Sequence, residues 1–71
     1  MKREELTSRE KEVLKYIALP RKEIAKRLFI EVTSVKQHIC NIYKKLKTND
    51  KAIAILTAIE KGILKNEDIV R

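Results

Sequence analysis

The segment at residues 31–47, EVTSVKQHICNIYKKLK, holds the side chains best suited to bind a polyanion. At 100° per residue, its apolar and polar residues fall on opposite sides of a helix. The apolar side predicts a buried stripe, formed by Val35, Ile39, Ile42 and Leu46. The polar side has no acidic residue and comprises Thr33, Lys36, Gln37, Cys40, Lys44 and Lys47. A lysine-bearing helix face is usually only solvated surface, but here no carboxylate at i,i+4 spacing neutralises the charge.

These polar groups are of the kinds that read duplex DNA. Lysine ammonium groups bind phosphates without reading sequence, whereas a glutamine makes a bidentate contact with adenine and a lysine donates to guanine O6 and N7. Gln37 lies near the N-terminus of the predicted helix, the end that helix-turn-helix motifs place against base edges. Residues 21–28 predict a short preceding helix, with the small residue Ala25 where two helices would cross. The sequence therefore predicts a helix-turn-helix whose partner is double-stranded DNA.

Composition narrows the classes of function. The chain has 71 residues, a formal charge of +7 and a pI of about 9.8, so we expect one small domain with an acidic partner. One cysteine and one histidine provide neither a disulfide framework nor a cluster of metal ligands, and no residues have catalytic spacing. The longest apolar run, residues 52–56, is too short to span a membrane. We expect a cytoplasmic, nucleoid-associated protein with no enzymatic activity, cofactor, metal or membrane partner.

Capping signals set the start of the fold. Thr7 and Glu10 have the spacing of a capping box, so a first helix should begin near Ser8. Leu19-Pro20 should end it, because the residue before a proline is disfavoured in a helix. We expect one domain over residues 1–71, with its core at about residues 6–64 and a short tail that either packs back on the core or frays.

Three more helices complete a predicted all-α fold. The second occupies residues 21–28, and Thr33 or Ser34 should cap a third that runs to about residue 47. A fourth should be capped within residues 49–50 and end at Gly62. In this arrangement the second and third helices form the helix-turn-helix, and the third is the recognition helix, at about residues 33–47.

Three segments resemble the LuxR/GerE-type helix-turn-helix domain of bacterial transcription regulators. They are Leu6-Thr7 followed by REKEVL, then KEIAKRLFI at residues 22–30, and VKQHICNIYKKL at residues 35–46. The resemblance extends over about residues 6–64 in colinear order. It implies a four-helix domain in which the second and third helices form the helix-turn-helix and the fourth commonly mediates dimerisation.

The resemblance also implies site residues by position. Base contacts in the major groove fall on Lys36, Gln37 and Cys40. Phosphate contacts fall on Thr33, Ser34, Asn41, Lys44 and Lys45. Cys40 replaces a position that is often polar or basic in this family, so the resemblance implies no particular operator sequence.

Two further departures from the family pattern concern the backbone. Between Leu14 and Glu23 the chain is a couple of residues shorter than is usual, so the first turn should be tighter. Lys47 stands where a glycine normally follows the Lys-Leu pair. Without that glycine, Asn49 is expected to adopt the left-handed conformation that ends the third helix.

The fourth helix is predicted to have two apolar faces. One should pack in the core and comprises Ala52, Ile55, Leu56 and Ile59. The other is small and largely apolar, and comprises Ile53, Ala54, Thr57 and Ala58. A monomer would expose this second face, so we expect it to form a homodimer contact; the alternative is that the C-terminal tail covers it. In a dimer the recognition helices should read half-sites about one helical turn apart.

We expect a small, sequence-specific, dimeric regulator of transcription that places its recognition helix in the major groove. Two alternatives remain open. One is a sigma-factor region 4-like module, which shares the opening Leu-Thr-x-Arg-Glu and has RNA polymerase as a partner in addition to promoter DNA. The other is a basic module that docks on an acidic protein or membrane. We also expect the chain to be a complete regulator, the alternative being a piece of a larger one.

Overall fold

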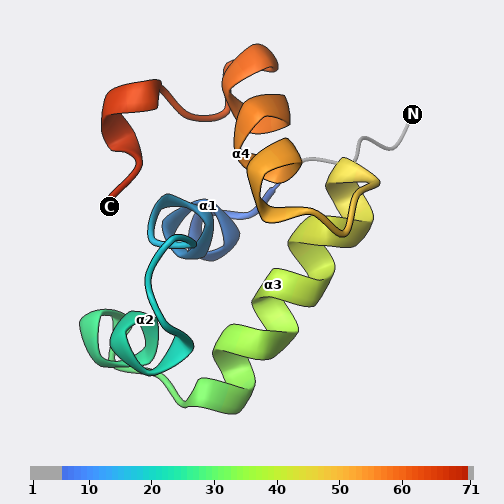
Figure 1. The fold of residues 1–71 in the computed structure, drawn as a ribbon. Helices are drawn as coiled ribbons and strands as arrows, with labels where there is room; N and C mark the ends of the chain where they lie inside the picture. Colours follow the sequence, from blue (N-terminus) through green and yellow to red (C-terminus); the bar gives the residue numbers. More distant parts are fainter. Residues whose placement is uncertain (1–5, 71) are drawn as a thin grey trace.

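The computed structural model describes residues 6–70 as an arrangement of helices with no strand. The helices are α1 (Ser8–Lys15), α2 (Arg21–Leu28), α3 (Val32–Leu46) and α4 (Lys51–Glu60), followed by the short 3₁₀ helix η1 (Asn66–Asp68). α3 is the longest, and α1, α2 and α4 all pack against it. The turn between α2 and α3 lies at the opposite end of α3 from α4 (Figure 1). The prediction of an all-α fold with four α-helices is confirmed.

Helix α1 begins with the predicted capping box. The backbone N–H of Glu10 donates to Thr7 Oγ1 at 3.1 Å, and the backbone N–H of Thr7 donates to Glu10 Oε1 at 2.9 Å. The helix ends at Lys15, and the chain reaches Pro20 through a tight turn in which the Leu19 N–H donates to the Tyr16 carbonyl at 2.9 Å. Pro20 then takes the N-cap position of α2, where its missing N–H leaves no donor unsatisfied.

The N-cap of helix α3 lies two or three residues before its predicted position. Glu31 occupies the N-cap position and its side chain makes no capping hydrogen bond to the helix backbone, so the prediction that Thr33 or Ser34 caps α3 is wrong. Both hydroxyl residues lie inside the first turn, and Thr33 Oγ1 donates to Glu31 Oε1 across 3.5 Å. The helix forms despite the weak cap because its apolar stripe is buried, which supplies most of the stability of a helix in a protein.

Two helices end at a non-glycine residue in the left-handed conformation. Phe29 ends α2 with φ 58° and ψ 43°, and Lys47 ends α3 with φ 58° and ψ 45°. Lys47 itself therefore adopts the conformation expected of Asn49, which corrects that prediction. In a Lys residue this backbone places Cβ close to the following carbonyl oxygen and costs about 1–2 kcal/mol.

The strain at Lys47 leads to a stability prediction. Lys47→Gly is expected to raise the free energy of unfolding by about 0.5–1 kcal/mol, because glycine adopts the left-handed conformation without a Cβ clash. Urea denaturation followed by circular dichroism measures it. The matched variant Lys44→Gly, inside α3, should instead lower the free energy of unfolding by about 1 kcal/mol. Equal destabilisation by both variants would contradict the strain.

The core lies where α1, α2 and α4 meet α3. Its fully buried members include Val13, Leu14, Ile24, Val35 and Ile42. The C-terminal segment packs back on this core through Leu64 and Ile69, which are 8% and 7% exposed. The Val70 N–H donates to the Lys15 carbonyl at 2.9 Å, so the tail is tied to the end of α1. Of the two alternatives for the tail, the structure therefore shows the packed one.

Helix α4 buries a different face from the predicted one. Ala54 and Ala58 have no exposed surface, whereas Leu56 and Ile53 are 60% and 50% exposed. Small alanine side chains at the contact let α4 lie close to the rest of the core. Ala54 and Ala58 are therefore core residues and not dimer contacts, and Leu56 and Ala52 are not core residues, which corrects both predictions. Within residues 6–70, no helix has the length and apolarity needed to cross a bilayer.

Candidate nucleic-acid interface

One side of α3 is free of contact with the rest of the fold. Its exposed residues include Thr33, Lys36, Gln37, Cys40, Lys44 and Lys47. On the opposite side Val35 and Ile42 are fully buried, and Ile39 and Leu46 are nearly so. The predicted division of α3 into a core stripe and an outward polar face is confirmed. We call this outward set the α3 polar face.

A hydrogen bond on the α3 polar face holds the amide of Gln37. Its Nε2 donates to Asn41 Oδ1 at 3.3 Å, one helical turn further along. Glutamine has two amide N–H donors and one carbonyl acceptor, so this bond leaves one donor and the acceptor for a partner. One donor and one acceptor are what a bidentate contact with the N7 and N6 groups of adenine requires. The Asn41 side chain, half-buried beside it, restricts the rotamers of Gln37.

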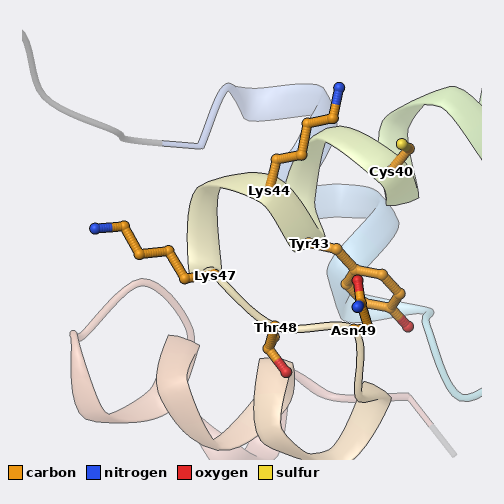
Figure 2. A pocket seen from close by; sticks show the side chains of 6 residues that line it. All are labelled: Cys40, Tyr43, Lys44, Lys47, Thr48 and Asn49. Atoms are coloured by element: carbon orange, nitrogen blue, oxygen red, sulfur yellow. The ribbon is translucent and has the colours of Figure 1, made fainter.

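The C-terminal end of the α3 polar face is concave. The concavity is lined by Cys40, Tyr43, Lys44, Lys47, Thr48 and Asn49. Figure 2 shows the side chains of Lys44 and Lys47 extending outward from α3, away from the Tyr43 ring. The Thr48 hydroxyl accepts from the Asp50 N–H at 3.0 Å, which fixes the loop to α4. Two exposed ammonium groups on an ordered surface suit a contact with phosphate.

Glu31 places a carboxylate at the other end of this face. It is exposed at the N-cap of α3, and its Oε1 accepts from the Thr33 hydroxyl. A negative charge here interacts favourably with the positive end of the helix dipole, but it repels a phosphate near the first turn. Phosphate contact is therefore better supported at Lys44 and Lys47 than at Thr33. Glu31 was not predicted as part of the site from the sequence, although it is an acidic residue two positions before the predicted hydroxyl cap Thr33.

Lys45 belongs to a different environment from the one predicted. Its Nζ donates to Glu10 Oε1 at 2.8 Å, the same oxygen that accepts from the Thr7 backbone N–H. The Glu10 side chain is 5% exposed and that of Lys45 is 26% exposed. This ion pair joins the last turn of α3 to the N-terminal cap of α1. Lys45 therefore supports the fold, and its assignment to the phosphate contacts stays a prediction.

The Glu10 carboxylate is stabilised in its charged form. Burial alone raises its pKa, but the hydrogen bonds from Lys45 and from the Thr7 backbone, with the positive charges of Lys45 and His38, outweigh burial. The pKa of Glu10 consequently lies below its ordinary value of 4.5. At neutral pH Glu10 is therefore ionised, and its contact with Lys45 joins α3 to the cap of α1.

The structure shows how the remaining predicted site residues lie. Lys36 and Cys40 are exposed on the α3 polar face, and Ser34 is half-buried at its edge. The Cys40 thiol is free. Among residues 6–70, no three His, Cys, Asp or Glu side chains come together to hold a metal ion. Val32, for which the sequence predicts no role, is 37% exposed in the first turn of α3.

Comparison with models of known protein families identifies the family to which this chain belongs. The GerE family model, described as bacterial regulatory proteins of the luxR family, matches residues 4–58. The chain belongs to the luxR family. The matched region runs from the start of the fold into α4 and contains both helices of the helix-turn-helix, which is the DNA-binding domain of these regulators. The assignment favours the LuxR/GerE-type reading over the sigma-factor region 4-like alternative.

Individual relatives in the luxR family are regulators of transcription. The transcriptional regulatory protein YxjL of Bacillus subtilis is 38% identical over 64 residues, covering 87% of this chain and 29% of the relative. LiaR of Bacillus subtilis is 46% identical over 57 residues, covering 78% and 27%. The nitrate/nitrite response regulator protein NarL of Escherichia coli is 44% identical over 52 residues, covering 70% and 24%. None of these names describes an enzyme, in agreement with the prediction.

The match to the luxR-family relatives covers only part of their length. This chain spans less than a third of the length of the curated relatives it matches. No solved structure matches the chain significantly. The likeness therefore concerns the helix-turn-helix domain of those proteins.

Proposed function

We propose that this chain binds duplex DNA selectively by sequence and regulates transcription, with α3 in the major groove. The observation that carries the proposal is the α3 polar face, which is exposed, free of acidic residues along Val32–Leu46 and backed by a fully packed stripe. The family and the relatives named as transcriptional regulators support it. Lys36, Gln37 and Cys40 are the proposed base contacts.

The proposed phosphate contacts flank these base contacts. Lys44 and Lys47 supply ammonium groups beside the concavity at the C-terminal end of the face. Thr33, Ser34 and Asn41 supply hydroxyl and amide groups along its edges. Phosphate contacts fix the position of the protein on the duplex, and the base contacts then supply the preference for a sequence.

Selectivity provides the test of the proposed base contacts. Gln37→Ala is expected to relax the preference at one base pair, with a loss of discrimination of ~1–3 kcal/mol, because the bidentate amide contact disappears. Relative affinities for a preferred duplex and its single-base variants measure it. Lys44→Ala is the control, since loss of a phosphate contact should weaken binding to every sequence alike and flatten the salt dependence by about one unit. If Gln37→Ala keeps the full preference at every position, Gln37 does not read a base.

We further propose that two copies of the chain pair through the outward face of α4. Ile53 and Leu56 lie on that face, one turn apart, and both expose half or more of their surface. Ala52 is exposed beside them, and Thr57 lies at the edge. Large exposed aliphatic side chains on one face indicate an interaction site. Because α4 is remote from the turn that begins α3, pairing there leaves the N-terminal part of both α3 polar faces available (Figure 1).

The pairing has a separate test. Leu56→Glu is expected to convert dimers to monomers and to lower the affinity for a two-half-site duplex by about 100-fold or more, since the linked second contact is lost. Sedimentation equilibrium gives the mass, and a DNA titration gives the affinity. Ala18→Glu introduces the same charge at an exposed position outside α4 and should change neither. An unchanged mass for Leu56→Glu would remove α4 from the interface.

A further inference from the structure

Val32 is the one large aliphatic side chain of α3 that the fold leaves exposed. It is 37% exposed, whereas Val35, Ile39, Ile42 and Leu46 are all at most 8% exposed. It belongs neither to the buried core nor to the partly buried side chains that pack against it. Its burial therefore contributes little to stability.

The position of Val32 in the helix does not account for a valine there either. It is the first residue of α3, where the side chain of the N-cap residue Glu31 makes no capping hydrogen bond to the helix backbone. A β-branched residue has a lower helix propensity than alanine, leucine or lysine, so valine does not favour helix formation here. Neither packing, capping nor propensity explains a valine at this position.

The helical geometry puts Val32 next to a proposed base contact. Val32 precedes Lys36 by four residues, so the two side chains lie on the same side of α3, one turn apart. Lys36 is exposed on the α3 polar face. The first turn of a recognition helix is also the part that approaches base edges in helix-turn-helix complexes.

We propose that Val32 reads the C5-methyl group of a thymine in the major groove, beside the base pair contacted by Lys36. Thymine is the base that presents a methyl group there, and an aliphatic side chain is its natural contact. The inference rests on the proposed function, because it needs α3 to occupy the major groove. It assigns a role in sequence preference to an apolar residue, whose side chain cannot form hydrogen bonds with a base.

Replacement of thymine by uracil isolates this contact, because it removes the methyl group and keeps every hydrogen-bonding group of the base. Each thymine of an operator obtained by selection is replaced in turn, and binding is measured by fluorescence anisotropy. For the wild type, uracil at one thymine per half-site is expected to lower the affinity about fourfold, the effect of about 0.8 kcal/mol for one buried methyl-sized group. For Val32→Ala, thymine and uracil at that site should bind equally well.

Two other variants serve as controls. Alanine is the best helix former, so Val32→Ala should keep α3 intact. Val32→Ile retains an aliphatic side chain and should retain the fourfold ratio. Phe29→Asn removes another exposed apolar side chain, 92% exposed in the turn outside α3, and should also leave the ratio unchanged.

The possible outcomes separate the two proposals. An operator with a methyl-sensitive thymine whose sensitivity disappears in Val32→Ala supports the assignment. An operator without any such thymine, or one whose sensitivity persists in Val32→Ala, overturns the role of Val32 and leaves the proposed function standing. A selection that enriches no operator overturns both.

Discussion

Replacing Lys36 and Lys44 together by glutamate is expected to lower the affinity for a preferred duplex by at least about 100-fold. Each substitution removes a charge-assisted contact, worth about 1.5–3 kcal/mol, and puts a carboxylate against DNA. Both residues are exposed on α3 and have no role in the core, so the fold should persist. A titration of the labelled duplex near physiological salt measures the loss, and circular dichroism confirms that the helices are intact.

The control for this variant must change the net charge equally. Lys11→Glu with Lys65→Glu also lowers the formal charge from +7 by four units, at exposed positions outside α3. Long-range attraction to DNA weakens in both double variants, whereas specific contacts are lost only in the first. A similar loss of affinity in both would show that binding follows the total charge and not the α3 polar face.

Lys45→Ala is expected to lower the free energy of unfolding by about 2 kcal/mol. The substitution leaves the nearly buried Glu10 carboxylate with the Thr7 backbone N–H but without its ammonium partner. Breaking a fully buried pair costs about 3–5 kcal/mol; the value here should be smaller because Lys45 is a quarter exposed. Urea denaturation measures the change. Arg9→Ala, which breaks the exposed pair with Glu12, should cost less than about 1 kcal/mol.

The pH dependence of the same variant gives an independent check. The pKa of Glu10 is lowered in the folded wild type, so the stability it contributes is present above its ordinary value of 4.5. That contribution is lost as the pH falls through the lowered pKa. The difference in stability between the wild type and Lys45→Ala should therefore be largest near pH 7 and narrow below about pH 4.5. A difference that is constant from pH 7 to pH 3 would show that the charge of Glu10 does not matter.

The parts of the fold that could be predicted from the sequence depend on residues that are close to one another in the chain. The capping box needs only Thr7 and Glu10, three residues apart, and both of its hydrogen bonds are present. The division of α3 follows from the 100° period, because its apolar residues occupy one side and its polar residues the other. The family resemblance rested on these same segments, and the family match confirms it.

The features that the sequence did not predict concern residues whose neighbours are distant in sequence or whose pattern is uniform. Helix α4 is apolar or small nearly all round, so periodicity does not select the face that Ala54 and Ala58 bury. The partner of Lys45 is Glu10, 35 residues away, and no helical spacing reveals such a pair. The left-handed conformation fell on Lys47 instead of Asn49 because the end of the apolar stripe at Leu46, and not residue preference, fixes where α3 stops.

The most direct measurement is selection of bound duplexes from a random DNA library near physiological salt, with the Lys36→Glu, Lys44→Glu variant selected in parallel. We expect the wild type to enrich an inverted repeat whose half-sites lie about one helical turn apart, and the variant to enrich nothing. Binding by the wild type without enrichment of any sequence would contradict sequence-selective recognition by α3.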